Sequence, residues 1–317
     1  MIEVRQVTKR FGDILAVDGV DLSVRKGEIF GLIGHNGTGK STLFKMMLGL
    51  ESPTSGKILI DGQPPQGEAF RQVRRAIGYL PENVVFYDNL TGLETLWFFA
   101  DLKREDRASC PAALLKVGLG DAAHRLVRGY SKGMRQRLGF AQSLLGQPKI
   151  LFLDEPTNGL DPEGIREFYR ILAELRTQGV TIILTSHILA EIQERVERVA
   201  IMKMGKICAM GTLQSLREQG NLPLRFRIDW PVGTADGLRR LLQPVGGTDI
   251  HSAGKSTWII ECARAEKMAV LSLLATMVPE ITDVQIEESN LEDIFLGYGK
   301  DRTETNPPIP DTLGERQ

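Results

Sequence analysis

Residues 34 to 41 read Gly-His-Asn-Gly-Thr-Gly-Lys-Ser, which fits the spacing G-x-x-x-x-G-K-[ST]. This octapeptide follows an apolar run, Phe30 to Ile33, and precedes a helix-like apolar period through Phe44, Met47 and Leu48. A strand, a glycine-rich loop and a helix in this order point backbone N–H groups and a helix N-terminus at a phosphate. The feature predicts an α/β fold that binds a nucleoside polyphosphate.

The side chains of the loop suit a magnesium-bound triphosphate. Its glycines allow a tight turn, Lys40 supplies positive charge to the β and γ phosphates, and the Ser41 hydroxyl is placed to ligate Mg²⁺. No second histidine, cysteine or carboxylate stands at ligand spacing beside His35, which favours a solvent-facing loop side chain over a metal ligand. The predicted nucleotide contacts here are Gly34, His35, Asn36, Gly37, Thr38, Gly39, Lys40, Ser41 and Thr42.

Two acids end a second apolar run, Ile150 to Leu153, which indicates a buried strand. Ligands bind at the carboxyl edge of parallel strands, so Asp154 is predicted to hold Mg²⁺ and Glu155 to orient the attacking water or accept its proton. A third strand-like run, Val180 to Leu184, is followed by His187, which is predicted to face the γ-phosphate. Alone, the acidic pair would also fit a solvated turn; the upstream loop favours the catalytic interpretation.

Hydrophobic periodicity organises the chain into two predicted domains and a tail. A helical pattern from Pro162 to Arg176 separates two of the strands, and this alternation predicts a parallel sheet covered by helices. Before it, the pattern predicts short antiparallel strands in residues 1–30, a hairpin at 52–62 and helices from about Asn83 to Tyr130. The expected boundaries are 1–220 for the nucleotide-binding domain with a helical part at about 83–145, 221–299 for a small α+β domain, and 300–317 for a disordered tail.

The expected strands of the small domain are 224–228, 257–262 and 281–287, and its expected helices are 236–242 and 265–277.

Charge is balanced over the whole chain, with 39 Lys and Arg against 40 Asp and Glu, so no global field draws it to nucleic acid. No signal-like start and no run of about twenty apolar residues is present, which predicts a cytoplasmic chain whose partner spans the membrane. Three cysteines without CxxC spacing, Cys110, Cys208 and Cys262, predict reduced thiols that lie mostly in the core.

Further motifs make the sequence similar to the nucleotide-binding subunits of ABC transporters. Tyr130 to Arg137, YSKGMRQR, is similar to the signature of that family, Asn158 to Asp161 resembles its D-loop, and His187 its switch histidine. Phe11 stands where the family stacks an aromatic ring on adenine. Together these motifs cover roughly residues 1–220.

The resemblance implies a P-loop cassette with a mixed sheet, an antiparallel β subdomain and a helical subdomain. It also implies ATP and Mg²⁺ as ligands, a head-to-tail dimer and an integral membrane permease as partner. In such a dimer Ser131 and Gly133 of a second copy complete each ATP site, and Asp161 of the D-loop is a further nucleotide contact. Two motifs depart from the family. Glu82 stands for the glutamine of the Q-loop, which makes its catalytic role an open point. In the signature, Lys132 and Met134 replace a glycine and a glutamine, and Lys132 faces either the phosphate or solvent.

Three segments, GHNG, GYLPENVVFY and YSKGMRQRLGFAQ, resemble the ATPases of copper-related nitrous oxide reductase maturation. The end of the small domain, Ser289 to Phe295, resembles the drug- and polysaccharide-export branch of the family. These resemblances imply a peripheral place on the cytoplasmic face of the inner membrane and a periplasmic copper-handling protein reached through the permease. Met202, Met204, Cys208 and Met210 offer soft ligands, but a hairpin with its turn at Gly205-Lys206 and alternating apolar packing explains them better.

Other functions remain open at this stage. The chain could drive a drug- or polysaccharide-type exporter with other cargo, act as a soluble ABC ATPase in translation or DNA repair, or be a non-catalytic interaction module. A single cassette, no long insertion and a net charge of −1 argue against the translation and repair classes. Phe86, Tyr87, Trp97 and Phe98 follow the Q-loop and could either contact a permease or pack in a helix core.

Overall fold

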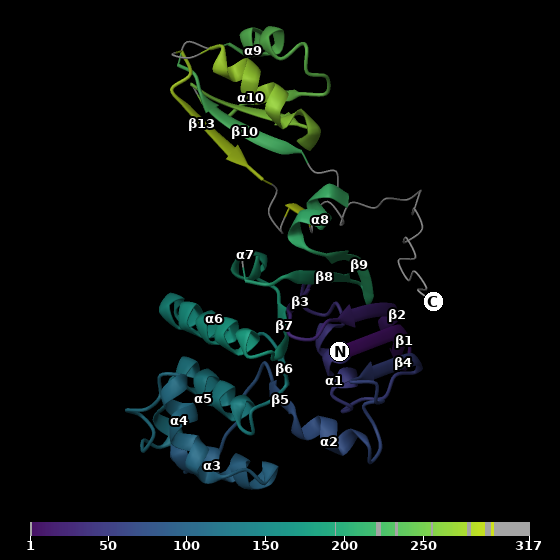
Figure 1. The fold of residues 1–317 in the computed structure, drawn as a ribbon, viewed down its shortest axis with the longest axis vertical. Helices are drawn as coiled ribbons and strands as arrows, with labels where there is room; N and C mark the ends of the chain where they lie inside the picture. The colour runs from purple at the N-terminus through teal and green to yellow at the C-terminus, as the bar shows by residue number, and fades with distance from the viewer. Residues whose placement is uncertain are drawn as a thin grey trace. The chain divides into compact units, whose positions relative to one another are not determined.

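The computed structural model of the chain describes residues 2–193, 195–219, 223–231, 234–254, 256–277, 280–288 and 293–294. The chain divides into two compact units, Met1–Leu216 and Arg217–Gln317 (Figure 1). The tail at 300–317 that is predicted to be disordered lies outside the described residues, as does most of the segment 289–295. None of the described helices combines the length and apolar character needed to cross a bilayer.

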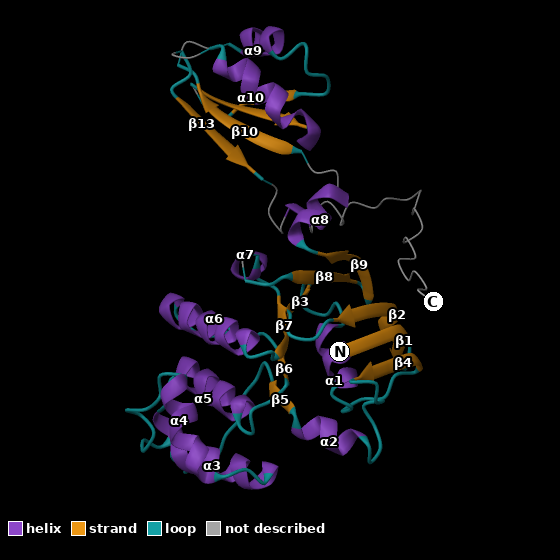
Figure 2. Ribbon diagram, in the orientation of Figure 1, coloured by secondary structure: helices purple, strands orange, loops and turns teal. Residues whose placement is uncertain are grey.

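A six-stranded mixed sheet forms the centre of the first unit (Figure 2). Its spatial order is β5 (Ile77–Leu80), β6 (Ile150–Leu153), β7 (Thr181–Ser186), β3 (Ile29–Ile33), β8 (Arg198–Lys203) and β9 (Lys206–Gly211). All neighbours are parallel except β8 and β9, which form an antiparallel hairpin. Every residue of β3, β6 and β7 is buried, as expected for parallel strands covered on both faces. The predicted α/β fold is confirmed, and the carboxyl ends of β3, β6 and β7 meet at one edge.

A three-stranded antiparallel sheet lies beside it, in the order β2 (Ile14–Val24), β1 (Ile2–Phe11) and β4 (Ser55–Ile60). Two long strands therefore replace the several short ones predicted for residues 1–30. The predicted hairpin at 52–62 is wrong, because β4 pairs along β1 instead. Gly56 makes this approach possible: a Cβ there would lie 2.2 Å from the Gln6 carbonyl oxygen.

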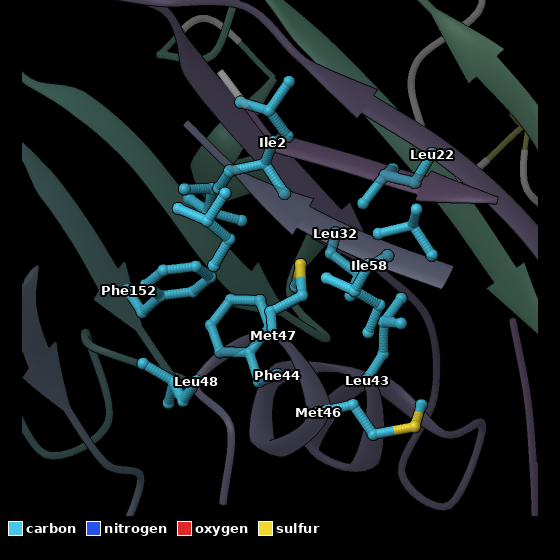
Figure 3. Packing of buried hydrophobic residues seen from close by; sticks show 14 of the residues in the cluster. Ile2, Leu22, Leu32, Leu43, Phe44, Met46, Met47, Leu48, Ile58 and Phe152 are labelled. Atoms are coloured by element: carbon cyan, nitrogen blue, oxygen red, sulfur yellow. The ribbon is translucent and has the colours of Figure 1, made fainter. Parts of the chain in front are cut away.

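Helix α1 (Lys40–Met47) packs its apolar face into the core of this unit (Figure 3). The ring of Phe44 meets that of Phe152 from β6 edge to face, with centroids 5.4 Å apart. Leu43 and Met47 contact the same cluster, to which Ile2 and Ile58 of the antiparallel sheet also belong. One core thus fixes the helix that follows the glycine-rich loop against strands from both sheets.

Helices cover the mixed sheet and form a group at its β5 end. They are α2 (Phe70–Arg75), α3 (Gly92–Lys103), α4 (Cys110–Lys116), α5 (Lys132–Leu144), α6 (Pro162–Thr177) and α7 (Leu189–Ile192), with 3-10 turns at Arg107–Ser109 and Val127–Gly129. Helix α8 (Leu213–Gln219) follows β9 and contains the boundary between the two units. The sequence pattern predicts helix from about Asn83, but α3 begins only after Thr91. That residue and Glu94 form a reciprocal capping box, which sets the start of the helix.

The β8–β9 hairpin carries the soft side chains of residues 202–210. Its turn is Met204-Gly205, one residue earlier than predicted, with Met204 in the left-handed region (φ 47°) and 82% exposed. Met202 is fully buried and Met210 packs partly against the core, so the packing interpretation holds for these two and is wrong for Met204. Cys208 is exposed, whereas Cys110 and Cys262 are buried as predicted. The described residues hold no cluster of three or more histidine, cysteine or acidic side chains suited to a metal ion.

The second unit is an antiparallel sheet with two helices over a separate core. The strands lie in the order β11 (Asp249–Ser252), β12 (Thr257–Cys262), β10 (Leu224–Asp229) and β13 (Asp283–Glu287). The helices are α9 (Ala235–Leu241) and α10 (Lys267–Ala275), and a 3-10 turn at Arg264–Glu266 precedes α10. Strand β11 is absent from the sequence prediction. Its sequence, DIHS, is polar and mostly exposed, so an edge strand of this kind leaves no apolar alternation to detect.

Candidate nucleotide-hydrolysis site

The loop from Gly34 to Gly39 joins the end of β3 to the start of α1. Gly39 has φ 102°, and a Cβ at this position would lie 2.3 Å from the Ala16 carbonyl oxygen. A Cβ at Gly34 would lie 2.4 Å from the carbonyl oxygen of Met202. Both positions therefore require glycine, and the loop is held tightly between β2 and the β8–β9 hairpin. His35 is exposed at the tip of the loop, as the sequence predicts.

Lys40 is the first residue of α1, and its side chain folds back across the loop. The Nζ atom donates to the carbonyl oxygens of Gly34 at 2.6 Å and His35 at 3.2 Å, and it lies 3.5 Å from Glu155 Oε1. The residue is buried, so this ammonium group is a charge fixed in place within the loop. Its position suits contact with a terminal phosphate on the Glu155 side of the loop.

Ser41 and Asp154 come together from α1 and the end of β6. Ser41 Oγ lies 3.5 Å from Asp154 Oδ1, and the same oxygen accepts a 2.6 Å hydrogen bond from Thr185 Oγ1. Oxygen ligands of this kind are the ones that Mg²⁺ prefers, so the pair fits the predicted metal position. Burial, and secondly the negative charge of Asp154, raise the pKa of Tyr79 to about 12, which keeps that neighbouring phenol protonated.

Glu155 is buried and takes a left-handed backbone conformation, with φ 47°. Its Oε2 lies 2.6 Å from His187 Nδ1 and accepts a 3.3 Å hydrogen bond from the His187 backbone N–H. With Glu155 ionised, the short contact places a proton on Nδ1 of His187. Oε1 accepts no hydrogen bond from the described residues and has the Lys40 ammonium 3.5 Å away. One carboxylate oxygen is thus held by the histidine and the other faces the phosphate loop.

The signature and D-loop residues cap two helices. Ser131 is the N-cap of α5 and accepts a hydrogen bond from Met134 N at 3.2 Å, while Asp161 is the N-cap of α6 and accepts from Gly164 N at 2.9 Å. Gly133 lies close to the D-loop, because a Cβ there would be 2.9 Å from the carbonyl oxygen of Gly159. Ser131 is exposed, and within the described part of the chain its hydrogen bonds stay in its own helix.

The structure thus brings Lys40, Ser41, Asp154, Glu155 and His187 into one cluster. It shows no contact of Ser131 or Gly133 with this cluster among the described residues. Phe11 is 44% exposed at the end of β1, with the Lys9 ammonium 4.6 Å from the centre of its ring, and Glu82 is exposed in the segment after β5. These two residues contact none of the five in the cluster through a described hydrogen bond or ion pair.

Two further residues link the site to its surroundings and have no role in the sequence prediction. Gln136 on α5 is buried and its Nε2 donates to the Pro156 carbonyl oxygen at 3.0 Å, which ties the signature helix to the residue after Glu155. Thr185 bonds to both catalytic-site acids. Thr185 stands at the end of an apolar run, which is a local signal, whereas Gln136 stands between two arginines and has no such signal.

The parallel sheet, the glycine-rich loop and the acids at the end of β6 define a P-loop nucleotide hydrolase. A family model described as ABC transporter matches residues 17–158. An uncharacterised ABC transporter ATP-binding protein of Bacillus subtilis, YhcH, is 36% identical over 93% of this chain and 95% of its own length. The chain therefore belongs to the ABC transporter ATP-binding proteins, and it is an ATPase of that class.

Two further similarities cover mainly the first unit. The bacitracin transport ATP-binding protein BcrA of Bacillus licheniformis is 38% identical over 72% of this chain and 75% of its own length. A solved dimeric bacterial ABC transporter cassette is 26% identical with a TM-score of 0.62, covering 67% of this chain and 99% of that structure. The similarity to YhcH extends through the second unit as well, because it spans nearly the whole chain.

Proposed function

We propose that this chain is the ATP-hydrolysing subunit of an ABC exporter of the drug-transport type, acting as a head-to-tail dimer on a membrane permease. The observation that carries the proposal is the Glu155 carboxylate, held by His187 on one oxygen and facing Lys40 with the other at the mouth of the phosphate loop. In this scheme residues 1–220 bind ATP, with residues 83–145 as the helical part, and 221–299 form an accessory domain.

The proposed step is hydrolysis of the terminal phosphate of ATP. Glu155 orients a water molecule and accepts its proton as the water oxygen attacks the γ-phosphorus and the bond to the ADP oxygen breaks. His187 holds the carboxylate in place, and Lys40 offsets the negative charge of the phosphate. When bound, Mg²⁺ supplies further charge neutralisation to the phosphates, and Ser41 and Asp154 are the residues that would hold it.

Other nucleotide contacts come from the edges of the site. The exposed ring of Phe11 is available to stack on adenine, and backbone groups of residues 34–42 bind the phosphates. Glu82 takes the Q-loop position, where its carboxylate would contact the attacking water or Mg²⁺ while adding a negative charge that glutamine does not carry. Its side chain is exposed in the segment after β5, which leaves it accessible to a partner.

A second copy of the chain completes the site in this proposal. Ser131 and the N-terminus of α5 are exposed, and nothing described in their own chain brings them to the phosphate loop. The solved cassette that resembles this chain is dimeric. Ser131, Gly133 and Asp161 of one copy would then face the ATP held by the other, with the positive end of α5 directed at the γ-phosphate.

A complementation experiment tests the head-to-tail arrangement. Lys40→Ala removes the lysine of the phosphate loop, and Ser131→Arg places a bulky side chain in the signature. Each ATP site needs the loop of one copy and the signature of the other, so each variant alone is expected to be inactive. Mixed in equal amounts, they form heterodimers with one intact site, since the unchanged loop of one chain meets the unchanged signature of the other. We expect ATPase activity to reappear on mixing. Heterodimers isolated through two different affinity tags and still inactive would contradict the arrangement.

The permease contact is proposed for an exposed apolar surface that follows Glu82. Val85 is 87% exposed, Tyr87 63%, Phe98 40% and Leu102 66%, and the Tyr87 and Phe98 rings meet edge to face at 6.0 Å. Exposed apolar side chains gathered in this way are typical of a protein interface. The interpretation of Phe98 as helix core is therefore wrong, because α3 turns this ring outward.

The double change Tyr87→Ala and Phe98→Ala is expected to abolish co-purification with a multi-spanning partner in mild detergent. The ATPase rate of the isolated subunit should stay within about twofold, because neither ring touches the catalytic cluster. Leu115→Ala on α4 is the matched control, since Leu115 is equally apolar and 73% exposed elsewhere in the helical group. Co-sedimentation with ribosomes or DNA and no membrane partner would instead support the translation or repair alternative.

The cargo is proposed from the relatives. BcrA is named for bacitracin transport, which favours export of a drug-like molecule. A second candidate is copper-related maturation of nitrous oxide reductase, which the segments GHNG, GYLPENVVFY and YSKGMRQRLGFAQ support. In that case metal handling would belong to the permease and a periplasmic partner, since the described residues of this chain hold no cluster of three or more histidine, cysteine or acidic side chains suited to a metal ion. A permease gene and a periplasmic copper-protein gene beside this one would favour the second candidate over the first.

A further inference from the structure

Thr185, near the end of β7, and His187, the first residue after this strand, both present polar side chains to the end of β6. Thr185 and His187 bond to the acids that follow β6, whereas Ser186 Oγ bonds to Ile188. His187 is part of the family motif. Thr185 has no role in the mechanism described above.

The Thr185 hydroxyl joins the two acids to each other. It donates a 2.6 Å hydrogen bond to Asp154 Oδ1 and accepts a 2.8 Å hydrogen bond from the backbone N–H of Glu155. Thr185 is fully buried and both acids are buried as well, so water has little access to replace either bond. The Thr185 hydroxyl therefore donates to Asp154, the proposed magnesium ligand, and accepts from the backbone N–H of Glu155, the proposed catalytic base.

The second of these bonds supports an unusual backbone conformation. Glu155 follows the ladder that β6 and β7 form up to Leu153 and Leu184, and it has φ 47°. A non-glycine residue in the left-handed region needs support from its surroundings. The Thr185 hydroxyl provides an acceptor for this N–H, and the turn that follows aims the Glu155 carboxylate at His187.

We propose that Thr185 is a positioning residue that sets the orientation of both Asp154 and Glu155. The inference rests on the proposed hydrolytic function of these acids. Valine has nearly the same shape as threonine but offers neither a donor to Asp154 nor an acceptor to the Glu155 N–H. Its introduction should loosen the Asp154 carboxylate beside Ser41 and let Glu155 leave its position next to His187. The phosphate loop itself has no contact with Thr185 among the described hydrogen bonds, so phosphate binding without metal should be unaffected.

The test compares Thr185→Val with Thr185→Ser, which restores the hydroxyl. We expect Thr185→Val to lower kcat by about tenfold or more and to raise the Mg²⁺ concentration for half-maximal activity several-fold. Binding of a fluorescent ATP analogue in EDTA should be unchanged. Thr185→Ser should keep kcat and the Mg²⁺ midpoint within about threefold of the parent.

Thr181→Val is the matched control. Thr181 lies on the same strand, is buried, and its hydroxyl accepts a 2.9 Å hydrogen bond from Gly27 N at the opposite end of the sheet. Its loss should lower the unfolding temperature without moving the Mg²⁺ midpoint. Should Thr185→Val be insoluble, Thr185→Ala removes the same hydroxyl with less bulk and is compared with Thr185→Ser in the same way.

The outcomes separate this inference from the proposed function. A Thr185→Val protein with the kcat and Mg²⁺ midpoint of the parent would overturn the positioning role, as would a serine variant no better than valine. A shift in the Thr181→Val midpoint equal to that of Thr185→Val would also overturn it, because the effect would then be general. An inactive parent, or a Glu155→Gln protein with the rate of the parent, would overturn the proposed hydrolysis instead.

Discussion

Glu155→Gln should bind ATP at least as tightly as the parent, accumulate as a closed dimer and lose turnover by about 10²–10⁴-fold. The amide has the shape of the carboxylate and can still contact His187, but it cannot accept a proton from water. The phosphate loop and the Lys40 contacts with Gly34 and His35 do not involve this side chain, so ATP binding is retained. Removing a buried carboxylate close to the γ-phosphate also lowers electrostatic repulsion, which should favour the ATP-bound dimer.

Three measurements check this prediction: phosphate release under saturating Mg-ATP, ATP affinity by equilibrium binding, and dimer content by light scattering after gel filtration. Glu163→Gln is the matched control, since Glu163 is an exposed carboxylate in the first turn of α6. It should leave all three quantities unchanged. A Glu155→Gln protein with an unchanged rate of phosphate release would remove Glu155 from the mechanism and reopen the possibility of a non-catalytic module.

The second large effect is expected for Lys40→Ala, which should weaken ATP binding. The ammonium group is held within the loop by two carbonyl oxygens, so its position is already set before a phosphate arrives. A charge-assisted hydrogen bond in such a site contributes about 1.5–3 kcal/mol, which corresponds to roughly a tenfold to hundredfold loss of ATP affinity. Turnover should disappear as well, because the charge of the γ-phosphate is no longer offset.

The same change affects the empty protein. Without Lys40, the buried Oε1 of Glu155 loses the cation that lies 3.5 Å away, so the variant is expected to unfold at a lower temperature than the parent. Lys45→Ala provides the control, because Lys45 lies on the same helix and is exposed. It should change neither ATP affinity nor stability. Equal ATP affinity in Lys40→Ala and Lys45→Ala would show that the loop does not bind the phosphates through this lysine.

The members of the cluster around Glu155 are predictable from the sequence, but their contacts with one another are not. Lys40, Asp154, Glu155 and His187 follow strands of a recognisable pattern, and parallel strands deliver their ends to one edge. The hydrogen bonds among the residues that follow these strands depend on the register of β6 and β7, which places Leu153 beside Leu184. A shift of one residue would turn Thr185 away from Asp154.

Errors in the fold prediction have a similar origin. The segment at 52–62 has the composition of a hairpin, yet β4 pairs with β1, fifty residues earlier in the chain. The partner of a strand depends on burial against α1 and on the close approach at Gly56, and neither is visible in a local pattern. Phe98 likewise lies in an apolar helical period, but the helix packs with this ring outward.

By itself the sequence determined the class of chemistry, because glycines, a lysine and paired acids at fixed spacings are sufficient to specify a phosphate loop and a water-activating edge. The tertiary structure alone decided how the acids are held: Thr185 between Asp154 and Glu155, His187 on one oxygen of Glu155, and Gln136 against Pro156. The physical reason is that a spacing along the chain fixes only local geometry. Hydrogen bonds between residues 20 to 32 positions apart exist only once strand register and core packing have placed them together.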